Sequence, residues 1–174
     1  QKVWDRYKDL SYSFETKTGA LDISKEEILK VMSKVKHLSD IQELIRTLLG
    51  QKKAYRVSKI LEIILAGGVA LKASDIHLEP AEKDVRLRYR LDGVLTDVLE
   101  FDRETFDLLL SRLKLVSNLK LNIKDRAQDG RFSIKLADSS MEVRVSLLPG
   151  ENGESVVLRV LSAESTFITL DNHD

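Results

Sequence analysis

Three arginines at alternate positions are the part of the sequence with the clearest potential for chemistry. Arg86, Arg88 and Arg90 alternate with apolar residues through 85–91, so a strand here places all three guanidinium groups on one face. A guanidinium is a rigid, permanently charged fork that matches the oxygens of a phosphate. The pattern therefore predicts either an anion-binding face or the solvated outer face of a sheet.

A second cluster combines two carboxylates with an imidazole. Asp75, His77 and Glu79 also alternate and would share one face of a strand. His-x-Glu could hold a metal, but a catalytic zinc site needs three protein ligands, and neither His37 nor His173 has an obvious partner. We therefore expect a hydrogen-bonded structural cluster and no bound metal.

Two further segments contain glycine in loop-like surroundings. Gln128-Asp129-Gly130-Arg131 includes Asp-Gly, which readily adopts positive φ and predicts a tight turn. The segment 150–154 is another glycine-bearing loop, but neither G-x-x-x-x-G-K-[ST] nor G-x-G-x-x-G occurs in the sequence. The spacing suggests no Ser–His–Asp or Cys–His arrangement either, so we expect no conventional active site within these residues.

Four helices are expected from apolar residues at helical spacing. Two short ones follow Ser24-Lys25-Glu26-Glu27 and Ser39-Asp40-Ile41-Gln42, each of which has the pattern of a capping box. A longer helix is expected over about 56–72, and Asp102 should cap one of about 17 residues. Gly67-Gly68 in the third helix indicates a close backbone contact, a kink or a break.

Strands are expected where the apolar period changes to two. Asp92-Gly93 predicts a hairpin with a type I′ turn. The whole pattern predicts an α+β fold, in which a curved antiparallel sheet is covered by helices on one face and preceded by a short helical segment. The expected strands are 20–23, 74–80, 85–91, 94–99, 131–136, 141–147 and 155–161.

The composition excludes several classes of protein. The chain has 174 residues with 28 Lys and Arg against 28 Asp and Glu, so it has no basic surplus for bulk binding of nucleic acid or anionic membrane. It has no cysteine, which excludes disulfides and thiolate metal sites. No apolar run reaches the roughly 18 residues that span a bilayer. We expect no nucleic-acid partner and no membrane insertion.

Six short motifs, taken in order, resemble the secretion and pilus-assembly ATPases of the type II secretion and type IV pilus systems. Each motif is weak alone, and their order makes the resemblance specific. The motifs are Ala73-Ser74-Asp75-Ile76-His77-Leu78-Glu79-Pro80, Arg88-Tyr89-Arg90-Leu91-Asp92-Gly93-Val94-Leu95, Ser111-Arg112-Leu113-Lys114, Gln128-Asp129-Gly130-Arg131, Arg144-Val145-Ser146-Leu147-Leu148-Pro149 and Gly153-Glu154-Ser155-Val156-Val157-Leu158-Arg159.

The resemblance implies a division of the chain and a place within a larger machine. Residues 1–54 would be a helical linker, 55–165 a PAS-like second N-terminal domain, and 166–174 a connector to an ATPase domain beyond the sequence. The parent would be a hexameric cytoplasmic motor at the inner membrane that uses ATP and Mg²⁺. Its partners would be its own ATPase domain, neighbouring subunits and inner-membrane platform components. The 174 residues alone should neither hydrolyse ATP nor bind it tightly.

The resemblance also implies that arginines of this domain reach the nucleotide phosphates. By position we expect these to be Arg88, Arg90, Arg103 and Arg112. The alternatives are a free-standing PAS-like sensory or protein-interaction module and an RNA-binding module that uses the arginine strand. An aromatic content of 6% and zero net charge count against RNA binding.

Overall fold

Four helices and seven strands make up the described part of the chain. The structure is a computed structural model, and it describes residues 20–21, 25–50, 53–135 and 140–161. The helices are α2 (Lys25–Lys34), α3 (Leu38–Leu49), α4 (Lys53–Ala70) and α5 (Arg103–Val116). The strands are β1 (Ala20–Leu21), β2 (Ile76–Pro80), β3 (Asp84–Leu91), β4 (Val94–Asp102), β5 (Gln128–Lys135), β6 (Ser140–Leu148) and β7 (Ser155–Val160).

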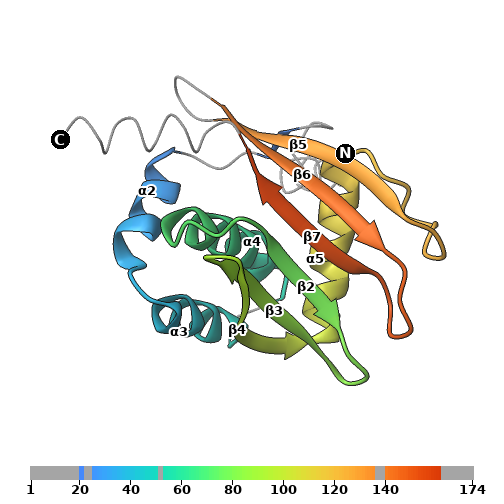
Figure 1. The fold of residues 1–174 in the computed structure, drawn as a ribbon, viewed down its shortest axis with the longest axis horizontal. Helices are drawn as coiled ribbons and strands as arrows, with labels where there is room; N and C mark the ends of the chain where they lie inside the picture. Colours follow the sequence, from blue (N-terminus) through green and yellow to red (C-terminus); the bar gives the residue numbers. More distant parts are fainter. Residues whose placement is uncertain (1–19, 22–24, 51–52, 136–139, 162–174) are drawn as a thin grey trace, which may run out of the picture.

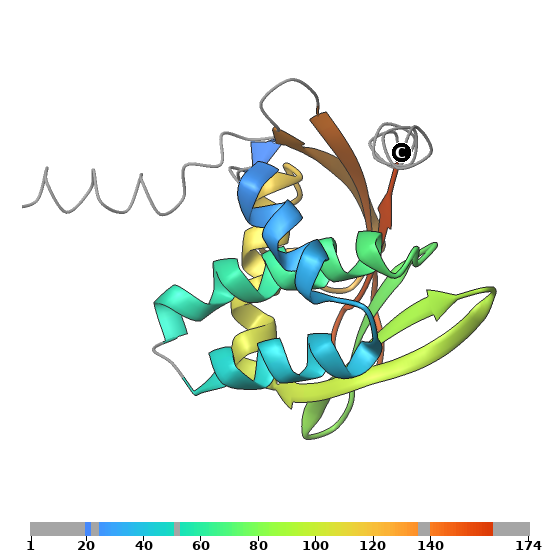
Figure 2. The same ribbon diagram turned by 90° about the vertical axis from the view of Figure 1, so that its left-hand side faces the viewer.

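The strands form one sheet in the order β1-β5-β6-β7-β2-β3-β4 (Figure 1). It consists of two antiparallel meanders, β2-β3-β4 and β5-β6-β7, joined where β2 pairs antiparallel with β7. The two-residue β1 adds to β5 in parallel. All four helices lie on one side of the sheet (Figure 2). The predicted α+β fold with a one-sided helical layer is confirmed.

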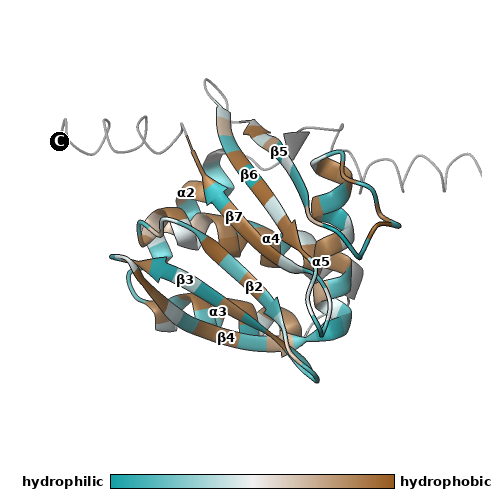
Figure 3. Ribbon diagram, turned by 45° about the vertical axis from the view of Figure 1, so that its right-hand side comes forward, coloured by the Kyte–Doolittle hydropathy of each residue, from teal (hydrophilic) through white to brown (hydrophobic). Residues whose placement is uncertain are grey.

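Strand alternation separates a buried face of the sheet from an open one. Apolar side chains at alternate positions of β3, β6 and β7 point towards the helices and are buried, while polar residues between them face away. The same alternation is visible along the strands in Figure 3. We call the side away from the helices the open face. The core lies between the other face and the helices.

The hairpin between β3 and β4 has the predicted turn. Asp92 and Gly93 both adopt positive φ, at 50° and 80°, as a type I′ turn requires. The return strand continues to Asp102, three residues further than predicted. This hairpin carries the arginines of β3 and their acidic neighbours on β4.

Helix α5 begins as predicted and ends early. The carboxylate of Asp102 accepts a hydrogen bond from the backbone N–H of Thr105 at 2.8 Å, which caps the helix. The helix has 14 residues instead of about 17, because Asn118 takes a left-handed conformation with φ of 58°. Such a residue ends a helix.

The start of α3 differs from the prediction by two residues. The helix begins at Leu38 with His37 as its N-cap, rather than with a cap at Ser39. Asp40 satisfies two of the backbone donors around this end, accepting from Lys36 at 2.9 Å and from His37 at 3.0 Å. The capping box predicted for α2 involves Ser24, which lies outside the described residues.

Gly67 and Gly68 lie within α4, which continues past them to Ala70. A Cβ atom on Gly67 would lie 2.7 Å from Cδ1 of Ile41, and one on Gly68 would lie 2.8 Å from Cδ1 of Ile76. These glycines therefore allow close packing against α3 and the sheet. The helix does not break at the glycines, and the close contacts are made by side chains of other elements against the α4 backbone.

The turn predicted at Gln128-Asp129-Gly130-Arg131 is wrong, because these residues begin β5. Gly130 does not have the positive φ that such a turn would require. A Cβ atom there would lie 2.8 Å from the carbonyl oxygen of Ser117. Gly130 thus permits a close approach between backbones, a role that turn statistics do not distinguish from a tight turn.

Helices α2 and α3 pack on the rest of the fold. Ile28, Ile41 and Ile45 are buried in the same core as α4 and the sheet, and the side chain of Gln42 donates to the carbonyl of Val98 on β4. Among the described helices, none has both the length and the apolar character needed to span a membrane.

Candidate anion-binding site

The arginines of β3 lie on the open face, as predicted, and each is paired with a carboxylate. Arg86 Nε lies 3.8 Å from Glu100, and Arg88 Nε lies 2.9 Å from Asp97. Arg88 also approaches Glu79 at 3.5 Å. These partners neutralise much of the charge that a ligand would otherwise meet.

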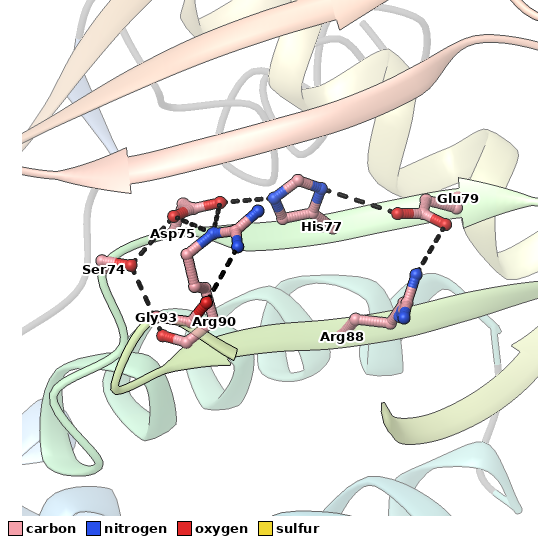
Figure 4. A network of polar contacts seen from close by, with 7 residues as sticks. All are labelled: Ser74, Asp75, His77, Glu79, Arg88, Arg90 and Gly93. Atoms are coloured by element: carbon pink, nitrogen blue, oxygen red, sulfur yellow. Dashed lines mark hydrogen bonds and ion pairs between the residues drawn. The ribbon is translucent and has the colours of Figure 1, made fainter. Parts of the chain in front are cut away.

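Arg90 belongs to a polar network around Asp75 (Figure 4). The Asp75 carboxylate accepts from Ser74 Oγ at 2.9 Å and from Arg90 Nε at 3.2 Å, and it contacts His77 Nε2. His77 Nδ1 lies 3.6 Å from Glu79. The hydrogen-bonded cluster expected for Asp75, His77 and Glu79 is therefore present, with Arg90 as a further member.

The network keeps Asp75 ionised although its side chain is only 6% exposed. Burial alone raises the pKa of Asp75, but hydrogen bonds from His77 and Ser74, together with the charge of Arg90, outweigh it, so the pKa lies below its ordinary value. Asp75 is thus a fixed negative charge near the centre of the sheet.

Arg103 and Arg112 lie away from the β3 arginines. Arg103 Nη1 donates to the carbonyl of Ala81 at 2.7 Å, and a Cβ atom on Gly153 would lie 3.2 Å from its Nη2. Arg112 lies within the helical layer, where it donates to Ser58 Oγ of α4 at 2.6 Å, and burial lowers the pKa of its guanidinium. The structure brings Arg88 and Arg90 together, but the four predicted arginines do not form one site.

Arg144 and Arg159 form a pair with different surroundings. They lie directly opposite each other on β6 and β7, and both are exposed on the open face. Within the described part of the chain, neither has a hydrogen bond or ion pair, whereas every other arginine on the described strands has an ion pair. Like charges directly opposite each other repel. Two unpaired guanidiniums side by side are therefore suited to an anion.

A hollow in the open face lies beside this pair. Its volume is about 300 Å³, and its lining includes Arg144, Arg159, Ser146 and Asp129. Arg131 extends the arginine row, since it pairs in register with Arg144, but it lies 3.4 Å from Glu142. Asp129 supplies one negative charge against the two positive charges of Arg144 and Arg159, so the lining of the hollow keeps a net positive charge.

The sequence pattern identified Arg144 and Arg159 only as parts of motifs. A signal for their pairing was available, because the two residues lie at equal distances in sequence from the middle of the 150–153 loop. A hairpin centred on that loop must place them opposite each other. What the pattern could not show is that their neighbours leave them without carboxylate partners.

Other motif residues support the fold around the site. Gln128 exchanges hydrogen bonds with the backbone of Lys120, at 2.9 and 3.1 Å. Gly153 has φ of 124°, which favours glycine. Glu154 forms a buried ion pair with Lys114 Nζ at 2.7 Å, and the same ammonium donates to the carbonyls of Leu121 and Ile123. These contacts fix the loop after α5 and the start of β7.

Comparison with known proteins identifies relatives over most of the chain. The family described as "Type II/IV secretion system protein" matches residues 50–174. Type II secretion system protein E of Pseudomonas aeruginosa is 40% identical over 125 residues, which are 72% of this chain and 25% of that protein.

Two other relatives extend the comparison. Type II secretion system protein E of Klebsiella pneumoniae is 32% identical over 173 residues, which are 98% of this chain and 34% of that protein. The type IV pilus assembly ATPase PilB of Myxococcus xanthus is 41% identical over 106 residues, which are 60% of this chain and 19% of that protein. The chain thus spans only about a fifth to a third of the length of these relatives. The match over residues 50–174 shows that this chain belongs to the type II/IV secretion system protein family.

Proposed function

We propose that this chain is a non-catalytic region of a motor ATPase that powers type II secretion or type IV pilus assembly. The name of one relative supports the activity of the parent, since PilB of Myxococcus xanthus is called a type IV pilus assembly ATPase. The sequence holds no phosphate loop, so the parent's nucleotide would be bound mainly by residues outside this chain.

The contribution of this chain is electrostatic. The observation that carries the proposal is the unpaired, cross-strand pair Arg144 and Arg159 beside a hollow in the open face. Two guanidinium groups fit a phosphate chain in charge and in donor geometry. They would stabilise the negative charge of a nucleotide held against the open face by the ATPase domain. Arginines placed on transferring phosphoryl groups act in this way in other phosphoryl-transfer enzymes.

Arg88, Arg90, Arg103 and Arg112 stay predicted phosphate contacts. For Arg88 and Arg90 to serve, a phosphate must compete with Asp97, Glu79 and Asp75, whose negative charges already lie beside these arginines. Arg112 lies on the helical side of the sheet. The geometry therefore favours Arg144 and Arg159 as the first phosphate contacts.

The remaining partners follow from the same proposal. The open face would meet the parent's ATPase domain or that of a neighbouring subunit in a hexamer, in the cytoplasm beside the inner-membrane platform. Without those domains, two exposed arginines offer the negatively charged ATP only salt-screened attraction. We expect millimolar affinity or weaker for the 174 residues alone, roughly −4 kcal/mol at best.

Steady-state ATP hydrolysis by the full-length parent tests the proposal. Arg144→Ala and Arg159→Ala should each lower turnover about tenfold or more, the size of effect seen for a lost phosphate-stabilising group. Arg86→Ala is the matched control, because Arg86 is exposed on the same face but lies beside Glu100. Unchanged turnover in both test variants, with folding intact, would rule out the proposed site. A loss of turnover seen only in Arg88→Ala and Arg90→Ala would instead place the phosphate site on β3.

A further inference from the structure

We propose that Arg90 and His77 are positioning residues, which hold Asp75 and so keep Arg159 free to bind an anion. This inference rests on the proposed function of the Arg144–Arg159 pair. It assigns the network of Figure 4 a role in that site without making Arg90 a phosphate ligand.

The register brings Asp75 next to Arg159. Ile76 on β2 pairs with Leu158 on the antiparallel β7. Because the strands are antiparallel, Asp75, which precedes Ile76, lies across from Arg159, which follows Leu158. The network places the Asp75 carboxylate on the open face, where Arg159 is exposed.

Opposite charges at such positions ordinarily form an ion pair. Here they do not, and Asp75 is instead fully engaged on its other side. Its two oxygens accept from Ser74 and Arg90 and contact His77. Arg90 is itself held by a second contact, since its Nη1 donates to the carbonyl of Gly93 in the β3–β4 turn at 3.3 Å. The carboxylate is thereby held towards β3 and away from β7.

Arg144 supplies an internal comparison. Its cross-strand neighbours are Arg131 and Arg159, so no carboxylate lies directly opposite it. Loss of the network should therefore reduce the availability of Arg159 and affect Arg144 much less. A direct phosphate contact by Arg90 would not produce this difference.

Titration of the 174-residue chain with inorganic triphosphate at low salt, followed by the NMR signals of the arginine Nε–H groups, tests the inference. Arg90→Leu should weaken binding about fivefold, the size of one partly exposed ion pair. Arg90→Leu combined with Asp75→Asn should restore the affinity to within about twofold, because the competing carboxylate is gone. If Arg90→Leu does not fold, Arg90→Gln removes the charge while keeping a donor.

Two results would overturn the inference. One is a double variant that binds as weakly as Arg90→Leu, which would make Arg90 itself a ligand. The other is wild-type affinity in Arg90→Leu. A measurement without anion separates this test from that of the proposed function. In the Arg90→Leu variant, the added change Asp75→Asn should shift the Arg159 Nε–H signal, because Asp75 would contact Arg159 there. In the wild type, Asp75→Asn should leave that signal unchanged. If triphosphate does not bind, or binds Arg144→Ala and Arg159→Ala unchanged, the proposed site fails whatever that shift shows.

Discussion

Asp75 is a buried residue whose ionised form is stabilised by the contacts that it makes in the fold. Its pKa is lowered in the folded chain, so its contribution to stability is complete above the pKa of an unfolded aspartate, about 3.9, and is lost as the pH falls through the lower folded value. Hydrogen bonds to a charged group are worth about 1.5–3 kcal/mol. We expect Asp75→Asn to lose about this much free energy of unfolding at neutral pH, and less in strong acid.

Urea unfolding of both proteins at several pH values between about 7 and 2 would measure this difference, since that range crosses the aspartate pKa. Asp107→Asn is a suitable control, because Asp107 is exposed on α5. Its effect should be small and should change little with pH. A loss from Asp75→Asn that stays constant down to the lowest pH would contradict the stabilising role of its charge.

At the scale of single elements, Gly130 has a steric role in β5. An alanine there would place Cβ 2.8 Å from the carbonyl oxygen of Ser117, and a backbone atom cannot move aside as a side chain can. We expect Gly130→Ala to cost about 1–3 kcal/mol of unfolding free energy, the usual range for overpacking. Gly50→Ala is the control, because its nearest contact is 3.6 Å away and its φ is negative. Equal thermal stability of the two variants would disprove the close contact.

The ion pair between α5 and β7 is a second element-level feature. Lys114 and Glu154 are 2% and 3% exposed, and removal of one partner leaves the other charge buried. We expect Lys114→Met to cost about 3–5 kcal/mol, and the added change Glu154→Leu to recover much of that loss. Urea midpoints of the single and double variants would check this. A double variant no more stable than Lys114→Met would mean that the carbonyl contacts of Lys114 matter more than its charge.

Periodicity and turn chemistry predicted most of these elements. Alternation placed the β3 arginines on one face, and Asp92-Gly93 predicted the turn that the structure contains. Asp-Gly at 129–130 gave a wrong prediction, because glycine is needed there for the close approach of the Ser117 backbone, which is distant in sequence but adjacent in the fold. The sequence pattern also could not predict which carboxylate each arginine pairs with. Arg90 and Arg159 look alike in sequence, but in the fold Arg90 forms an ion pair with Asp75, whereas Arg159 lies opposite Arg144 without one.

At the scale of the whole molecule, α2 and α3 share the core with the sheet. The predicted domain boundary between residues 54 and 55 would let residues 55–165 fold without α2 and α3. The shared core instead favours folding of the two parts together. Ile28, Ile41 and Ile45 are at most 1% exposed, and each such side chain contributes about 1.5–3 kcal/mol when buried. We expect a chain that begins at residue 53 to lose most of its stability, which circular dichroism in urea would measure against the full sequence. A similar midpoint for both chains would support the division as predicted.

The junction of the two meanders has a consequence for how the anion site comes into being. Strands β2 to β4 are local in sequence, and so are β5 to β7, whereas the β2–β7 pair joins residues about 80 positions apart. Loop-closure entropy makes such a distant pairing slow to form. Arg144 and Arg159 lie on one meander, while Asp75 and Arg90 lie on the other. The Asp75 network therefore comes to lie beside the two arginines only when β2 pairs with β7, so the carboxylate that it must hold away from Arg159 reaches that arginine late in the assembly of the sheet.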